Sequence, residues 1–344
     1  MKMPWPWPRR VRKDRLVFAC DDAGFAYVQA EGERIVRCGL ELRGDDDATG
    51  LARRVRALDL PSQGVTAVLP LADSQLLPIE APAVPPEELK AAARWKIKGL
   101  VDAHIDDLTI DVMHVGQAGE GRQKAARQLF VVTTPSQRVR ALCDWSLEAK
   151  LQLAVIDIRE TAQRNLQAAR ARARGRADRA DATLMVHGNQ CLVTLCAQEE
   201  LFYARRLDWN PQWLEARISA PAVAPNDRPM SDFADLDIVD YGAADDAGGT
   251  LANDAPPIVI EIQRSLDVWE RSWPELRLDQ LAVYANGQTA AMVAMLEPQL
   301  AIPVHAIDLA ALFPGYAEAA GSPAVENAVA PLLGALLRHE MRKL

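Results

Sequence analysis

The sequence predicts an α/β protein made of two related lobes, because one order of elements occurs twice along the chain. The first copy opens with LVFAC-DDAG-FAYVQA at 16–30, two apolar strands joined by a tight glycine turn. The second copy opens with ATLMV-HGNQ-CLVTLCA at 182–197, which repeats this strand–turn–strand pattern. In each copy a third strand, a helix, a strand and a further helix follow. This order favours sheets covered by helices over a closed barrel.

Length and composition agree with two lobes and exclude several classes of protein. The chain has 344 residues, of which 49% are hydrophobic and 25% charged, as in ordinary globular proteins. The net charge of −8 argues against nucleic acid as the main partner. The five cysteines are scattered without a C-x-x-C pair, which favours reduced thiols. The sequence has neither a signal peptide nor an apolar run of about 18 residues, so we expect a soluble, cytoplasmic protein.

The elements of the first lobe follow from its apolar runs and their spacing. Apolar residues recur at every second position in a strand and about every 3.6 residues in a helix, and this difference distinguishes the two kinds of element. We expect strands at 16–20, 25–30, 34–42, 65–71 and 153–158, and helices at 49–60, 138–152 and 160–181.

An insertion at about 73–136 interrupts this lobe. The Pro-rich passage 78–86 introduces a helix, since proline suits a helix start. Two strands, at 107–115 and 127–135, complete the insertion. The helix shows apolar residues at helical spacing, namely Leu89, Ala93, Ile97 and Leu100.

The second lobe contains a segment that lacks core residues, at about 219–256. Between Asn226 and Pro257 it carries eight aspartates and one arginine, so it repels itself and is expected to be flexible. The chain therefore divides into a basic leader rich in Trp and Pro at 1–15, a first lobe at 16–181 and a second lobe at 182–344. The remaining elements are helices at 257–273, 288–300 and 324–340, and strands at 278–287 and 302–309.

Three longer stretches resemble a known family. The segments at 84–112, 155–166 and 261–270 are similar to the MshI proteins of mannose-sensitive hemagglutinin (MSHA) type IV pilus biogenesis, which are relatives of PilM. The resemblance covers nearly the whole chain and is weakest at the N-terminus and in 219–256. It implies the actin-like ATPase fold, a duplicated ribonuclease H-like arrangement that binds ATP and Mg²⁺ between its lobes. It also implies a place on the cytoplasmic side of the inner membrane, where the inserted subdomain grips the tail of a bitopic PilN-like partner.

The two hairpin turns are the candidate phosphate site. Backbone N–H groups of such turns bind phosphate, and they need glycine for a close approach. In the first turn, Gly24 can serve this purpose and Asp22 can orient Mg²⁺ through water, with Asp21 as the alternative acid. An ordinary surface turn also favours Asp and Gly. In the second turn Gly188 remains, but His187 and its neighbours supply no carboxylate, which argues against Mg²⁺-dependent hydrolysis.

Two further pairs are candidates for contact with the nucleoside. Glu261 and Arg264 lie three apart on one helical face, which borders adenosine in the family that the chain resembles. The alternative is an exposed ion pair of little energetic value. Asn286 and Gly287 lie between a strand and a helix, where relatives seat adenine, although glycine is common at such junctions.

Trp95 is the candidate for partner binding within the insertion. Aromatic residues are enriched at interaction hot spots, but packing of Trp95 in the core of the insertion is the simpler interpretation. Likewise, Trp5 and Trp7 in the basic leader suit either a disordered leader or a contact with an anionic membrane surface.

The sequence therefore favours an assembly protein that acts by binding and has a degenerate nucleotide site. The alternative is an active ATPase that switches the assembly, with Asp22 holding the metal. A more distant alternative is a sugar or acetate kinase of the same fold. No Walker loop, hydrolytic base or nucleophile triad appears in the sequence.

Overall fold

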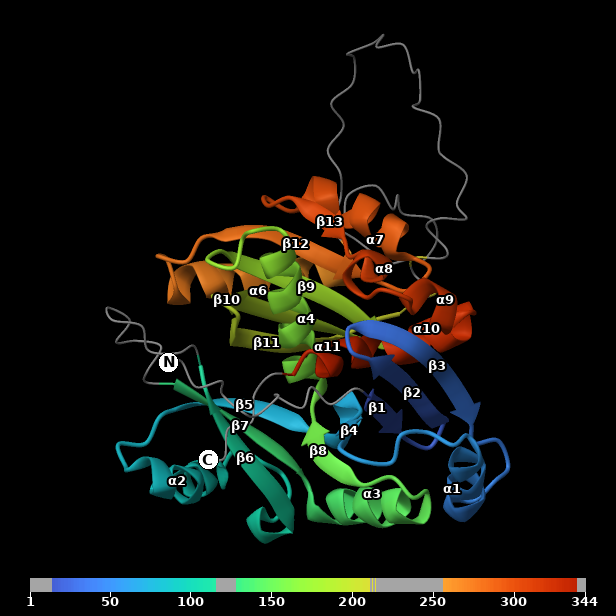
Figure 1. Cartoon of the computed structure of the whole chain (residues 1–344). Helices are drawn as coiled ribbons and strands as arrows, with labels where there is room; N and C mark the ends of the chain where they lie inside the picture. Colours follow the sequence, from blue (N-terminus) through green and yellow to red (C-terminus); the bar gives the residue numbers. More distant parts are fainter. Residues whose placement is uncertain (1–13, 116–127, 211, 213, 215–255, 339–344) are drawn as a thin grey trace, which may run out of the picture.

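The computed structural model describes residues 14–115, 128–210, 212, 214 and 256–338. In this part of the chain, two five-stranded sheets form the two lobes and a three-stranded sheet forms a small subdomain beside the first (Figure 1). Most of the predicted leader and nearly all of the acidic segment lie outside the described residues. None of the described helices combines the length and the hydropathy that a membrane span requires.

The two large sheets have the same topology. The first has the strand order β3-β2-β1-β4-β8, and the second has the order β11-β10-β9-β12-β13. In each, three antiparallel strands are followed by two strands parallel to the first one. This duplicated arrangement is the actin-like ATPase fold, as the sequence predicted. The strands are β1 (Asp14–Cys20), β2 (Gly24–Glu31), β3 (Arg34–Leu42), β4 (Val65–Val68), β8 (Leu153–Asp157), β9 (Ala180–His187), β10 (Gln190–Ala197), β11 (Glu200–Asp208), β12 (Leu278–Tyr284) and β13 (Val304–Ala306).

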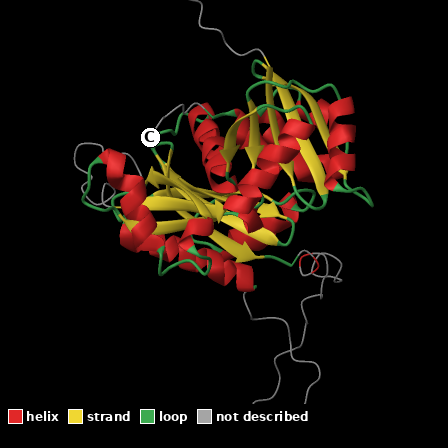
Figure 2. Ribbon diagram, turned by 90° about the horizontal axis from the view of Figure 1, so that it is seen from below, coloured by secondary structure: helices red, strands yellow, loops and turns green. Residues whose placement is uncertain are grey.

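Helices cover the sheets on both sides (Figure 2). Both faces of the strand β1 are therefore buried. Leu16 and Phe18 pack under the outer helices, whereas Val17 and Ala19 pack between the lobes. Burial on both faces gives the continuous apolar run of the sequence. The helices are α1 (Ala48–Ala57) and α3 (Ser136–Glu148) outside the first sheet, α6 (Pro257–Ser272) and α7 (Thr289–Leu296) outside the second, and α4 (Arg159–Ala173), α8 (Leu309–Leu312), α9 (Tyr316–Ala320), α10 (Pro323–Val329) and α11 (Leu333–Leu336) on the inner side.

The small subdomain lies between β4 and β8 in the sequence. Its sheet has the order β5-β7-β6, and the helix α2 packs on it. The elements are β5 (Gln75–Glu80), α2 (Leu89–Ile97), β6 (Leu108–His114) and β7 (Gln128–Pro135). The sequence did not predict β5, because Pro78 interrupts it. Within the described part of the chain β5 pairs with β7 alone, which makes it an edge strand, where a missing N–H is tolerated.

Two predicted helices end or break earlier than expected. The helix α4 ends at Ala173 rather than at 181, since Gly175 follows with φ +65° and stops it. The predicted helix at 324–340 is broken after Val329, because Pro331 has no N–H to donate and lies in a short 3₁₀ turn before α11.

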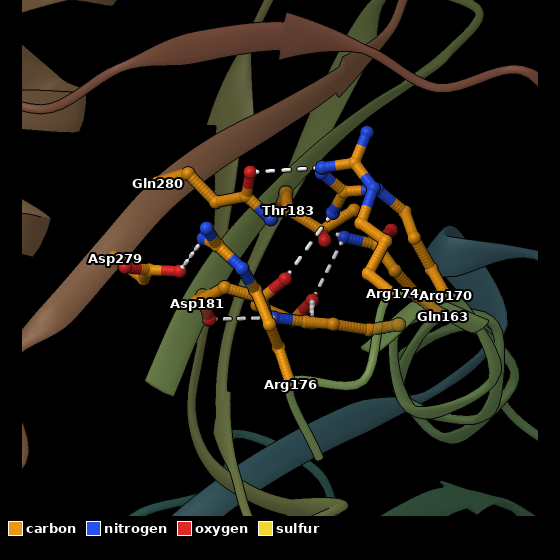
Figure 3. Close-up of polar contacts among 10 residues, drawn as sticks. Gln163, Arg170, Arg174, Arg176, Asp181, Thr183, Asp279 and Gln280 are labelled. Atoms are coloured by element: carbon orange, nitrogen blue, oxygen red, sulfur yellow. Dashed lines mark hydrogen bonds and ion pairs between the residues drawn. The ribbon is translucent and has the colours of Figure 1, made fainter. Parts of the chain in front are cut away.

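Buried polar contacts connect α4 to the second lobe (Figure 3). The amide Nε2 of Gln163 donates to the carbonyl oxygens of Thr183 and Leu192, both at 3.0 Å. About two helical turns further along α4, Arg170 Nη1 donates to Asp181 Oδ2 at 3.2 Å. Since β9 and β10 belong to the second lobe, the helix that follows the last strand of the first lobe is bound to the other sheet.

Candidate functional site

A cleft of about 420 Å³ lies where the turns of the two hairpins face each other. Both lobes contribute to it, as does the first residue of α4. The lining includes Asp21, Ala23 and Gly24 of the first turn, His187, Gly188 and Gln190 of the second, Arg159 of α4, and Asn327, Ala328 and Pro331 near α10.

Asp21 organises the first turn. Its Oδ1 accepts hydrogen bonds from the backbone N–H of Ala23 at 2.9 Å and of Gly24 at 3.1 Å. Gly24 is required by close packing, because a Cβ at this position would lie 2.2 Å from the carbonyl oxygen of Glu41. The first turn is therefore held rigidly against β3.

Asp22 points away from this arrangement. Its side chain is 99% exposed and accepts from Arg43 Nη1 at 2.8 Å. The residues that line the cleft include Asp21 and not Asp22. The structure thus places the alternative acid in the cleft, and a metal-binding role for Asp22 stays a prediction.

The second turn is more open. Gly188 has φ +63°, a left-handed conformation that favours glycine, and no heavy atom lies within 4 Å of a Cβ built there. Beside it, His187 has a buried Nε2 without a hydrogen-bond partner among the described residues. Burial, with the nearby charges of Arg159 and Arg206, lowers the pKa of His187 to about 3, so the imidazole is neutral.

Arg159 is a residue of the cleft that the sequence interpretation missed. It is only 9% exposed, and its Nη1 has no hydrogen-bond partner among the described residues. Burial lowers its pKa to about 10, against the opposing charges of Asp21 and Glu160, so it remains a cation at neutral pH. The sequence could have indicated Arg159 through its position just after the strand at 153–158, which is β8 in the structure. Ligands of α/β sheets bind outside the carboxyl ends of parallel strands.

Arg206 of β11 joins the lobes beside the cleft. It contacts Glu160 Oε1 through Nη2 at 2.6 Å and through Nε at 3.0 Å. Its Nη1 donates to the carbonyl oxygens of Leu71, in the segment after β4, and of Ser74, the latter at 2.6 Å. The charge of Arg206 is thus balanced by Glu160, whereas no acid among the described residues forms a hydrogen bond with Arg159.

Among the described residues, Asp21 is the acid in the lining of this cleft. Its Oδ1 accepts two backbone hydrogen bonds, so Oδ2 is the oxygen that it can offer to a cation. Mg²⁺ is usually bound through one or two carboxylates together with waters and substrate phosphates, and the guanidinium of Arg159 repels a cation that is not accompanied by an anion. Within the described part of the chain, three or more His, Cys, Asp or Glu residues do not come together in a metal-binding arrangement.

The other predicted nucleotide residues lie outside this cleft. Glu261 Oε1 accepts a hydrogen bond from Arg264 Nη1 at 2.5 Å, and Glu261 also pairs with Arg205 of β11. Glu261, Arg264 and Arg205 therefore form an ion-pair network. Asn286, with φ +52°, lines a second pocket of about 630 Å³, and Gly287 adjoins it in the chain. The structure brings Asp21, Gly24 and Gly188 together, but not these residues. Their roles in nucleotide binding stay predictions.

Trp95 lies on the outer face of α2. Its exposed fraction is 74%, and Lys98 Nζ lies 5.5 Å from the centre of its ring. The buried face of α2 consists instead of Leu89, Ala93 and Ile97. The interpretation of Trp95 as a core residue is therefore wrong, because the apolar spacing of the helix is satisfied without it. Its role in partner binding remains a prediction.

Comparison with known proteins supports the fold. No family model and no curated protein matches the sequence. The structure is similar to a chain of the PilM-PilN type IV pilus biogenesis complex, with a TM-score of 0.64 and 14% identity over 94% of this chain and 98% of that chain. At this identity the likeness shows a shared fold.

Two weaker likenesses have TM-scores below 0.5. The first is to the cytoplasmic domain of EpsL, an inner-membrane component of the type II secretion system of Vibrio cholerae, with a TM-score of 0.42 and 13% identity over 62% of this chain and 79% of that chain. The second is to a Bacteroides thetaiotaomicron protein of actin-like ATPase fold and unknown function, with a TM-score of 0.46 and 10% identity over 86% of this chain and 91% of that chain.

Proposed function

We propose that this protein is an assembly component of a type IV pilus machine, of the MshI kind found in MSHA pili. In this proposal it sits on the cytoplasmic face of the inner membrane and docks the cytoplasmic tail of a bitopic PilN-like partner. Two observations support it. The sequence resemblance includes 84–112, and the PilM-PilN likeness extends over 94% of this chain.

The observation that carries the proposal is the exposed apolar surface of α2 and the turn after it. Trp95 is 74% exposed and Leu100 is 58% exposed, whereas large apolar side chains are normally buried. An exposed tryptophan is the residue type that most often anchors an interface. The neighbouring charges are largely engaged within the subdomain, in the pairs Lys90–Asp111, Arg94–Asp106 and Lys96–Glu80.

Hydrogen exchange tests where the tail docks. The full chain is labelled with and without a saturating peptide that carries the cytoplasmic tail of the PilN-like protein of the same organism. We expect slower exchange over 89–100, because a bound peptide shields these amides and opposes local opening. Protection confined to other elements would move the docking surface and overturn this assignment.

The alternative function is an ATPase that switches the assembly. It is favoured by the cleft itself, because the turns of both hairpins line it. Phosphate release from ATP and Mg²⁺ distinguishes the two functions. Binding without turnover predicts no release above the level of a matched Asp21→Ala, Asp22→Ala double variant. Release that the double variant abolishes would establish the ATPase instead.

A further inference from the structure

The pocket of about 630 Å³ in the second lobe lies at the carboxyl ends of two parallel strands. Tyr284, the last residue of β12, and Ala306, the last residue of β13, both line it. Residues of α8, α9 and α10 form the rest of its wall, beside these strands (Figure 1). Ligands of α/β sheets bind at the carboxyl ends of parallel strands. The pocket therefore has the position and the volume of a small-molecule site.

The charge of this pocket is negative. Asp308 and Glu326 line it, and its described lining contains no lysine, arginine or histidine. Neither acid forms an ion pair with any residue that the structure describes. Asp308 Oδ1 accepts from the backbone N–H of Ala311 at 3.0 Å, and Glu326 Oε1 accepts from the hydroxyl of Tyr284 at 3.1 Å. Two carboxylates without a cationic partner attract a positively charged ligand.

Two enclosed polar atoms of the lining also lack partners. The hydroxyl of Tyr316, a buried residue of α9, makes no hydrogen bond within the described ranges, and neither does Oδ1 of Asn286. Buried polar atoms are normally hydrogen-bonded. Burial and the nearby carboxylate of Glu326 raise the pKa of Tyr316, so its hydroxyl stays neutral. Oδ1 of Asn286 is an acceptor, so it calls for a ligand that carries a hydrogen-bond donor.

We propose that this pocket binds an alkylammonium group, carried either by a free polyamine or by a lysine side chain. An ammonium has three N–H donors and no acceptor, which matches the carboxylates and Oδ1 of Asn286. The faces of tyrosine rings also attract a cation. The apolar part of the lining, with Ile307 and Ala317, can cover the alkyl stem. The same carboxylates repel phosphate, so the pocket disfavours a nucleotide.

This inference goes beyond the proposed docking function and uses different residues. Docking depends on α2 of the small subdomain, whereas the ammonium site depends on the second lobe. Either can therefore fail while the other stands.

Calorimetric titration of the full chain with putrescine tests the proposal. We expect saturable binding of putrescine, and binding at least about tenfold weaker of the butanediol that has hydroxyl groups in place of its two ammonium groups. Titration with Nα-acetyl-lysine amide distinguishes the sources. Tighter binding of putrescine assigns a free polyamine, whereas equal or tighter binding of the lysine derivative assigns a protein side chain. Displacement of bound putrescine by an equal concentration of AMP would overturn the proposal.

Substitutions assign the binding to this pocket. Glu326→Gln and Asp308→Asn are each expected to weaken putrescine binding about tenfold, the effect of losing a charged hydrogen-bond partner. Asp308→Asn keeps a residue that caps the helix α8. Tyr316→Phe keeps the ring and should weaken binding less. Glu297→Gln removes an exposed acid outside the lining and serves as the matched control. Undetectable binding to the wild type, equal binding of the butanediol, or unchanged affinity in both carboxylate variants would overturn the proposal.

Discussion

Arg206 Nη2 of β11 lies 2.6 Å from Oε1 of Glu160, the second residue of α4. The Glu160 side chain is 1% exposed and that of Arg206 is 24% exposed, so the pair is largely buried between the lobes. Removal of the arginine leaves the carboxylate buried without its main partner.

We therefore predict that Arg206→Ala lowers the free energy of unfolding by about 3–5 kcal/mol, the cost of leaving one buried charge uncompensated. The control is Arg172→Ala, which breaks the more exposed pair with Glu199 and should cost less than about 1 kcal/mol. Urea unfolding of the three proteins measures both. Equal losses of unfolding free energy in the two variants would show that the interlobe pair contributes no more to stability than an exposed ion pair.

The two hairpin glycines should respond differently to alanine. In Gly188→Ala the new Cβ has open space, so only the left-handed backbone is penalised, by about 1–2 kcal/mol. In Gly24→Ala the Cβ would also meet the carbonyl oxygen of Glu41 at 2.2 Å, which adds about 1–3 kcal/mol. Gly32→Ala, at φ +60° with open space, is the matched control. Thermal unfolding ranks the three, and a Gly24→Ala no less stable than Gly32→Ala would argue against tight packing of the first turn.

His187 should make stability depend on pH. Burial, with the charges of Arg159 and Arg206, lowers its pKa from 6.5 to about 3 in the folded state. The unfolded state therefore binds a proton that the folded state does not, and stability falls as the pH drops from about 6.5 toward 3. The slope approaches about 1.4 kcal/mol per pH unit.

Unfolding free energies at pH 7.5 and 5.5 measure this dependence. His187→Gln removes the titrating group, so its stability should fall less between these values than that of the wild type. Parallel losses in the two proteins would place the cause of the pH dependence in other groups.

The buried contact between α4 and β9 should be more costly to break than its exposed neighbour. Asp181, whose side chain is 8% exposed, pairs with Arg170 at 3.2 Å, whereas Asp279 pairs with the half-exposed Arg176 (Figure 3). We expect Asp181→Ala to lower the unfolding free energy by about 3–5 kcal/mol, because Arg170 is then buried alone. Asp279→Ala should cost less than about 1 kcal/mol. Urea unfolding compares the two, and similar costs would contradict a structural role for the buried contact.

The elements with a strong apolar period could be predicted from the sequence, and the hairpin repeat gave the fold. The strand β5 could not, because Pro78 is compatible with a strand only at a sheet edge, and the edge is set by distant pairing with β7. The break after Val329 is local, and Pro331 was a signal for it. The spacing of apolar residues along α2 could not predict that Trp95 is exposed, because its exposure depends on which face of α2 packs on the sheet.

The candidate site was predictable only in part, for a related reason. The two turns are local features, so Gly24 and Gly188 could be found by comparing the hairpins. The choice between Asp21 and Asp22 depends on which carboxylate accepts the turn amides and which one meets Arg43, a residue of the adjoining loop. Arg159 approaches the turns only when the sheets assemble around α4, and adjacent sequence does not reveal this proximity.

The affinity of the partner's tail for variants of the exposed α2 surface tests the central claim most directly. A fluorescent peptide of the PilN-like cytoplasmic tail is titrated with wild type, Trp95→Ala and Leu147→Ala. Leu147 is the matched control, a 69% exposed apolar residue of α3. We predict that Trp95→Ala weakens binding about 30-fold, the effect of a hot-spot residue worth about 2 kcal/mol, while Leu147→Ala leaves the Kd unchanged. Equal affinity of wild type and Trp95→Ala would contradict docking of the tail on α2.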